Sequence, residues 1–180
     1  MEDNILEQLK YPIGQAVIPN TILLEDIKKW TKILEEFPSQ LEALVLPLTE
    51  EQLQTPYRPG GWTVRQLLYH IGDSHHHSYT RFKWALAEDR PVIKAYEEKD
   101  WAELKDAKQA PIRISLDYIK ALHAKLVYMI KTLSETDLKR IFIHPEGNKE
   151  VSLKANIGMY AWHSQHHFAH IKNLIEREGW

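Results

Sequence analysis

The sequence contains no cysteine among its 180 residues. This absence excludes disulfide bonds, thiol nucleophiles and thiolate metal ligands. Any metal ion bound by the chain must therefore be held by nitrogen and oxygen atoms. Glycine is also scarce, with only 7 residues, which favours helices over a protein built from many short strands.

Two further absences narrow the class of protein. The formal charge is only −2 at pH 7, and basic residues are interspersed with acidic ones, which disfavours nucleic-acid binding. No apolar run approaches the roughly 20 residues that a membrane helix requires, so no membrane contact is expected. The first ten residues, MEDNILEQLK, are acidic and do not resemble a secretory signal, so the cytoplasm is the expected location.

The composition that remains is typical of a globular protein, with 43% hydrophobic and 27% charged residues. A chain of this length is expected to form one domain over residues 1–180. Residues 1–20 contain turn formers, among them Pro12 and Pro19, and show no helical period. They predict an extended N-terminal arm that lies on the body of the domain.

Apolar residues recur at spacings of three and four in four segments, each of which predicts an amphipathic helix. In the first of them, Pro38 is expected to kink the helix or divide it in two. Thr63 and Gln66 match a capping box at the start of the second, and Gly179 is expected to stop the last. The four segments are approximately residues 23–48, 62–88, 114–133 and 154–178.

The segments between these helices differ in character. Residues 89–111 hold prolines, charges and scattered aromatics, and predict a long connection with at most a short helix. Residues 140–144 and 150–153 predict two short strands joined by a turn. Because four apolar stripes can close around a shared core, the fold class is an all-α four-helix bundle with a small β-hairpin before the last helix.

The stretch HSQHHFAH, residues 163–170, places four of the ten histidines in the last helix. At about 100° per residue, His163 and His167 lie nearer the apolar stripe, whereas His166 and His170 point toward solvent. Two imidazoles four residues apart can reach one divalent ion. Histidines near a surface are also often merely solvated, so this spacing alone leaves both interpretations open.

The second helix contributes further candidates in the stretch YHIGDSHHHSY. Consecutive histidines diverge by about 100° each and cannot share one ion, and the apolar stripe places His75 closer to the core than His70. Asp73 could orient a ligand imidazole through its second N–H, or it could be a solvated charge. His123 is interpreted as a surface or core residue of the bundle and His144 as part of the hairpin. The candidates in this helix are His70, His75, His76 and His77.

Four motifs together cover nearly the whole chain: YPIG at 11–14, TPYRPGGWTVRQLLYHIGDSH at 55–75, YAWHSQHHFAHI at 160–171 and the terminal EGW. With these motifs the chain resembles the DinB-like superfamily and, within it, the YfiT-like branch of candidate metal-dependent hydrolases. The resemblance implies an up-down-down-up bundle and one divalent metal, zinc or nickel, held by His70, His163 and His167. On the last helix this agrees with the helical angles, whereas the choice of His70 over His75 rests on the resemblance.

Three neutral histidines leave a coordination position open, so the metal can act as a Lewis acid and activate water. The first hypothesis is therefore hydrolysis of an acyl, amide or similar electrophilic substrate. The second, suggested by relatives in the superfamily, is transfer of a low-molecular-weight thiol such as bacillithiol to an electrophile. The third is a metal-binding module without enzymatic activity. No catalytic acid or base is singled out from the candidates Asp73, His77, Tyr160 and His166.

The expected partners are a small-molecule substrate and a second copy of the chain. The resemblance implies a homodimer, to which the arm could contribute contact surface. Four tryptophans could add to that surface: Trp30, Trp84, Trp101 and Trp180.

Overall fold

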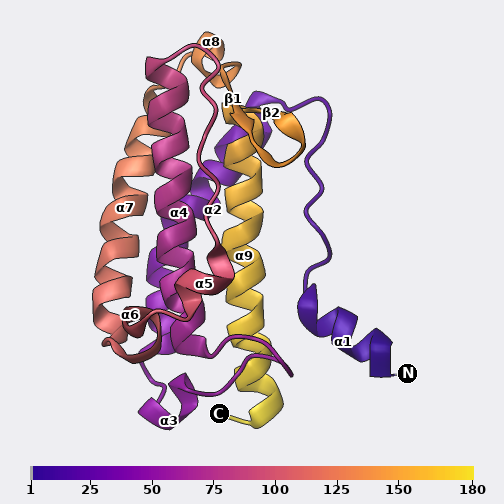
Figure 1. The fold of residues 1–180 in the computed structure, drawn as a ribbon, viewed down its shortest axis with the longest axis vertical. Coiled ribbons are helices and arrows are strands. Elements are labelled where there is room, and N and C mark those ends of the chain that lie inside the picture. The colour runs from indigo at the N-terminus through magenta and orange to yellow at the C-terminus, as the bar shows by residue number, and fades with distance from the viewer. Residues whose placement is uncertain (1) are drawn as a thin grey trace.

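A computed structural model describes residues 2–180 as a bundle of four long helices with shorter elements at both ends and along one side (Figure 1). The long helices are α2 (Leu24–Val45), α4 (Val64–Ala87), α7 (Ile112–Thr132) and α9 (Leu153–Glu178). The shorter elements are α1 (Glu2–Lys10), α3 (Glu50–Leu53), α5 (Glu98–Ala102), α6 (Lys105–Gln109), α8 (Glu135–Leu138), β1 (Ile141–His144), the 3₁₀ turn η1 (Glu146–Asn148) and β2 (Lys149–Ser152).

The bundle has the expected up-down-down-up topology. Helix α2 packs against α7 and α9, and α4 packs against the same two helices. In Figure 1, α4 and α7 run from the α3 end toward the hairpin end, and α2 and α9 run in the opposite direction. Two successive long helices can be parallel because residues 88–111 return the chain along the bundle before α7 begins.

The hairpin before α9 is confirmed. Strands β1 and β2 pair antiparallel, from Ile141 opposite Ser152 to His144 opposite Lys149. The backbone N–H of Ile93 donates to the carbonyl of Ile143 over 3.0 Å, so the returning segment is attached to the hairpin.

Local signals set several helix ends. The Thr63 hydroxyl accepts from the Gln66 N–H, and the Gln66 side chain accepts from the Thr63 N–H, so the expected capping box starts α4. Helix α9 ends at Gly179, whose left-handed φ of 72° suits glycine. Pro38, by contrast, does not divide α2, which continues through it as one helix.

Two expectations for the connecting segments were wrong in part. The arm is not extended throughout, because residues 2–10 form α1. The returning segment contains two short helices, α5 and α6, where at most one was expected. The short helices α3 and α8 were not anticipated, although each begins at a capping box, at Thr49 and at Ser134.

The core consists of two apolar clusters with a layer of buried polar side chains between them. The cluster near the hairpin includes Leu34, Phe82 and Leu126, and the cluster near α3 includes Phe37 and Ile119. The polar layer comprises His70, Ser74, His75, Ser78, His123, Asn156, Ser164, His166, His167 and His170. Buried polar groups are costly unless they are paired, so this layer is where a functional site is expected. Over residues 2–180, no helix has both the length and the apolar character that a membrane span needs.

Candidate metal centre

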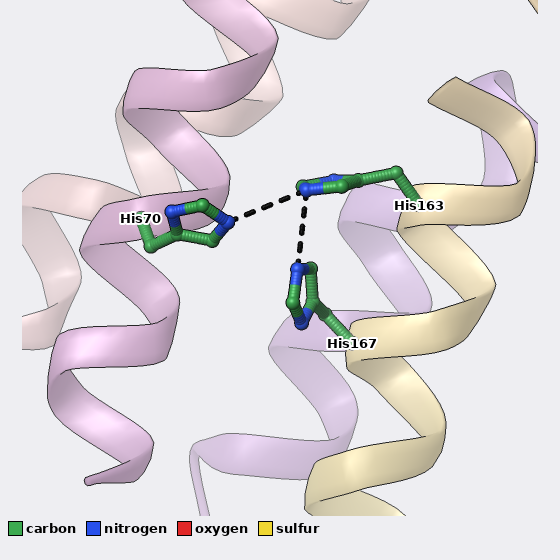
Figure 2. Close-up of side chains that lie close together, drawn as sticks. All are labelled: His70, His163 and His167. Carbon is green, nitrogen blue, oxygen red and sulfur yellow. Dashed lines mark hydrogen bonds between the residues drawn. The ribbon is translucent and has the colours of Figure 1, made fainter. Parts of the chain in front are cut away.

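Helices α4 and α9 bring three histidines together at the polar layer (Figure 2). His70 lies about two turns after the capped start of α4, and the cap residue Gln66 also donates to the carbonyl of Ala102 over 2.8 Å. This bond ties the start of α4 to the segment that carries α5. His163 and His167 lie one turn apart on α9 and point toward His70.

The three rings meet through the same ring atom. The His163 Nε2 lies 3.3 Å from the His70 Nε2 and 3.1 Å from the His167 Nε2. Zinc–nitrogen bonds of about 2.0–2.1 Å place the nitrogens of a tetrahedral site about 3.3 Å apart. The spacing of the three imidazoles therefore fits one divalent ion, and the three ligand atoms all lie within 4.8 Å of one another.

All three rings are held in the neutral form, which is the form that binds a metal. Burial lowers the pKa of His70 to about 4, with a smaller effect of His166. Burial also lowers the pKa of His163 and of His167 well below the ordinary value, and the neighbouring histidines add to this. At neutral pH their lone pairs are thus available without loss of a proton.

The three histidines form part of the wall of a cavity of about 650 Å³. Trp62 lies against His70, with ring centroids 4.6 Å apart, and Trp162 stacks on His166 at 4.3 Å. Both cationic and acidic side chains line the rest of the cavity: Lys10, Arg58, Lys99, Glu98, Asp100 and Glu103. The volume falls within the range of about 300–1,000 Å³ that is usual for small-molecule pockets.

The structure corrects the expectation that His166 and His170 point toward solvent, because both are buried. The prediction from helical angles took account only of the side of α9 that packs in the bundle, and not of segments that cover its other side. The N-terminal arm and the loop before α4 cover this side of the helix. The Lys10 carbonyl contacts His170, and the Tyr57 ring stacks on the His170 ring with centroids 4.2 Å apart. Lys10 and Tyr11 also line the cavity, which the sequence alone gave no means to anticipate.

His75 lies in the core, as its angle predicted, and does not join the three converging nitrogens. Its Nε2 is 3.0 Å from the Nδ1 of His163, the ring nitrogen that faces away from His70. His123, which had no partner in the sequence, is buried and contacts His75. Asp73 is half-buried, and no hydrogen bond between described residues joins it to His70, so the orienting role considered for it has no support.

The four candidates for a general acid or base lie in different surroundings. Of these, His166 lines the cavity, and burial lowers its pKa to about 4. Tyr160 lies 3.5 Å from the Ser74 hydroxyl, within the core. His77 stacks on Tyr96 at 4.2 Å, and burial, together with Arg81, lowers its pKa to about 4. Burial raises the pKa of Asp73 to about 6.

A helical bundle with three converging neutral imidazoles beside a cavity defines a class of protein whose site can hold a metal ion. The family model for the DinB superfamily matches residues 33–171, and the chain belongs to this superfamily.

Curated relatives match over nearly their whole length. A protein of Bacillus subtilis (strain 168) named "Putative metal-dependent hydrolase YfiT" is 45% identical over 172 residues, which span 96% of this chain and 97% of the relative. A relative from Bacillus mycoides (strain KBAB4) is named "Putative metal-dependent hydrolase BcerKBAB4_2443". It is 47% identical over 175 residues, which span 97% of this chain and 100% of the relative.

The fold comparison agrees with the sequence comparison. The solved structure of YfiT from Bacillus subtilis superposes with a TM-score of 0.94 at 45% identity, covering 96% of this chain and 99% of the other. That protein is described as "a probable metal-dependent hydrolase with an unusual four-helix bundle topology".

Proposed function

We propose that this protein is a metal-dependent hydrolase in which His70, His163 and His167 hold one divalent ion, zinc or nickel. The observation that carries the proposal is the convergence of three Nε2 atoms, with spacings of 3.1 and 3.3 Å, at the wall of a cavity. Three imidazole ligands leave a coordination position for water or substrate, which distinguishes catalytic from closed structural sites. The names of the relatives support the same reading.

The roles of the surrounding residues follow from their positions. A bound divalent ion would supply Lewis-acid chemistry, polarising a carbonyl oxygen and lowering the pKa of water toward about 7. Trp62 and Trp162 give the cavity two aromatic walls, against His70 and His166, on which an apolar part of a substrate can pack. His166 is neutral at pH 7 and lines the same cavity, so it is placed to hydrogen-bond to a molecule bound there, whereas its pKa of about 4 makes it a weak base.

A second candidate function is transfer of a low-molecular-weight thiol to an electrophile. The size of the cavity favours it, since about 650 Å³ leaves room for a cosubstrate beside an electrophilic substrate. The cationic side chains of Lys10 and Arg58 at the cavity could pair with the carboxylates that such thiols carry. A metal-binding module without enzymatic activity is the third candidate.

The first experiment measures the metal content of untagged protein that was purified without a nickel column. We expect one zinc or nickel ion per chain, lost in His70→Ala, His163→Ala and His167→Ala. His144→Ala, a matched change in the hairpin, should keep the metal. A wild-type protein that binds neither metal when it is added, or a His70→Ala variant that retains it, would contradict the three-histidine site.

Activity assays then separate the candidate reactions. The metal-loaded protein is tested with a panel of esters, amides and electrophiles, with and without added small thiols. Turnover without thiol supports the hydrolase, and turnover that requires thiol supports the transferase. A metal-loaded wild-type protein that turns over nothing, with or without thiol, supports the module without activity.

A further inference from the structure

Two of the three converging histidines have further histidines behind them. The Nδ1 of His163 lies 3.0 Å from the Nε2 of His75, whose Nδ1 lies 2.9 Å from the Nε2 of His123. The Nδ1 of His123 lies 2.7 Å from the carbonyl oxygen of Leu34. We call this series the core chain. It runs from the candidate metal centre through α4 and α7 to the backbone of α2.

The direction of every hydrogen bond in the core chain follows from its last member. A carbonyl oxygen can only accept, so the Nδ1 of His123 carries the hydrogen and donates to Leu34. A neutral imidazole has one N–H, so the Nε2 of His123 is bare and accepts from the Nδ1–H of His75. By the same step the Nε2 of His75 accepts from the Nδ1–H of His163. The bare nitrogen of His163 is then its Nε2, which faces His70 and His167.

A second, shorter series stands behind His167, and we call it the arm chain. The Nε2 of His170 lies 3.1 Å from the carbonyl oxygen of Lys10, so it donates to that carbonyl. The Nδ1 of His170 is then bare, and it lies 3.3 Å from the Nδ1 of His167. His167 donates through Nδ1, and its bare nitrogen is the Nε2, which points at the same place as that of His163. In this assignment the two bare Nε2 atoms lie 3.1 Å apart with no hydrogen between them, a repulsion that a bound cation would relieve.

We propose that His75, His123 and His170 are positioning residues that fix the tautomers of His163 and His167. At its far end each series of hydrogen bonds stops at a backbone carbonyl, which can only accept a hydrogen bond. At its near end each series leaves a lone pair aimed at the candidate metal centre. The proposal deepens the function proposed above and rests on it where the metal is concerned. The tautomers themselves are a property of the metal-free protein and can be measured separately.

His70 differs from the other two, because its Nδ1 has no hydrogen-bond partner among the described side chains and backbone. Among the described residues, no hydrogen bond to its Nδ1 sets its tautomer. In the metal-free protein its Nε2–H can donate to the bare Nε2 of His163, 3.3 Å away. His163 and His167 therefore already have a bare Nε2 before a metal binds. His70 must move its hydrogen from Nε2 to Nδ1 when the metal binds.

Two other uses of these residues fit the structure less well. A proton wire would need an outlet to solvent at its far end, whereas the core chain stops at the Leu34 carbonyl and His123 is only 1% exposed. A second metal ion could be imagined among His166, His167 and His170, whose ring nitrogens lie close together. It would have to displace the hydrogens of the arm chain, and it predicts two ions per chain where the arm chain predicts one.

The direct test is nuclear magnetic resonance of ¹⁵N-histidine-labelled, metal-free wild-type protein at about pH 8, where these rings are neutral. Long-range nitrogen–hydrogen correlations distinguish the protonated ring nitrogen from the bare one. We expect Nδ1–H for His75, His123, His163 and His167, and Nε2–H for His170. An Nε2–H form of His163 or His75 would overturn the core chain, and an Nδ1–H form of His170 would overturn the arm chain.

The second test compares paired variants by their affinity for zinc, measured by competition with a chelator. His75→Leu removes the acceptor for the Nδ1–H of His163, whereas His75→Gln supplies an amide oxygen in its place. We expect the leucine variant to bind zinc about 10–100-fold more weakly and the glutamine variant to recover most of the affinity. His170→Leu should also weaken binding by about 10–100-fold.

Controls separate the possible failures. His144→Gln, in the hairpin, should leave zinc affinity unchanged. A folded His75→Leu protein with wild-type zinc affinity would overturn the positioning role, and two zinc ions per chain would overturn the arm chain. If the leucine variants do not fold, the wild-type spectra and the glutamine variant still decide the question. If the wild type binds no metal, the proposed function fails while the spectra still test both chains.

Discussion

Arg65 is a buried cation, with only 2% of its side chain exposed. One guanidinium nitrogen donates to the carbonyl of Ala110 over 2.6 Å, and another pairs with Glu50. The residue thereby ties the first turn of α4 to α3 and to the end of the segment that carries α5 and α6. This arrangement supports the elements around the cavity although Arg65 itself does not line it.

Replacing Arg65 with methionine should lower the free energy of unfolding by about 1–3 kcal/mol, because the Ala110 carbonyl loses its donor in a partly buried place. Urea unfolding followed by circular dichroism measures the change. Arg113→Met is the matched control, since Arg113 pairs with Glu42 and Asp117 at the surface, and it should change stability little. Equal losses in the two variants would contradict this account of Arg65.

At the residue scale, the sequence predicted the site residues whose relative positions are set within a single helix. His163 and His167 could be placed together because four residues make about one turn of α9. The choice between His70 and His75 could not be made in this way, since it depends on how α4 faces α9. His75 is indeed the more buried of the two, yet it lies behind His163.

At the scale of helices, Gly158 of α9 lies directly against Trp30 of α2 and Ile18 of the arm. A methyl group built on its α-carbon would lie 2.9 Å from two ring carbons of Trp30 and 3.0 Å from Ile18. Gly158→Ala should therefore destabilise the protein by about 1 kcal/mol net. Overpacking costs about 1–3 kcal/mol, and the gain in helix propensity offsets only about 1 kcal/mol of it.

Gly72 in α4 provides the comparison, because there the nearest atoms would lie 3.4 Å away, at ordinary contact distance from Ser115 and Tyr118. Gly72→Ala should be neutral or stabilising, since only the propensity gain remains. Thermal unfolding of both variants measures the difference, and an equal gain from both would contradict the close packing at Gly158.

Helix boundaries were predictable where a capping side chain or a glycine accounts for the unpaired backbone groups at the helix end. Thr63 and Gln66 start α4 and Gly179 ends α9, as their types indicate. The long helices were predictable because each has an apolar stripe. The sequence allowed for one short helix between residues 89 and 111 but could not place α5 and α6, because each has only five residues, too few for periodicity to be read. Both are held to α4 through tertiary contacts.

At the scale of the whole molecule, the buried histidines should make the metal-free protein sensitive to acid. Burial lowers the pKa to about 4 for each of His70, His123, His166 and His170. Between about pH 6.5 and 4 the unfolded chain thus binds more protons than the folded chain, and stability falls as pH falls. Asp73, whose pKa burial raises to about 6, acts in the opposite direction with a single proton.

We therefore expect the free energy of unfolding of metal-free protein to fall by more than about 1.4 kcal/mol per pH unit below pH 6, since several histidines contribute. Urea unfolding at pH 7.5, 6 and 5 measures the slope. A free energy that is constant over this range, or that rises as the pH falls, would show that the histidines are not held neutral by burial.

We also propose that the protein is a homodimer and that the arm contributes to the contact. Val17 in the arm is 84% exposed, and Leu23, the residue before α2, is 59% exposed, so both offer apolar surface. Light scattering after gel filtration should give twice the chain mass of 21.2 kDa, and Val17→Lys should shift the protein toward the monomer. Val92→Lys, at an exposed valine outside the arm, is the control. A monomeric wild type would contradict the proposal.

The hydrogen bonds behind the candidate metal centre join residues that are far apart along the chain. The bond from His170 to Lys10 closes a separation of 160 residues, and that from His123 to Leu34 closes one of 89. Contacts of such long range are slow to form, because the entropy of closing the long loop must be lost before the contact is made. A partly folded protein would not yet hold these carbonyls against His123 and His170, so the ligand tautomers would not be set. Acquisition of the metal would accordingly be among the last events of folding, and a centre with both prepared ligands would report that the chain has been completed.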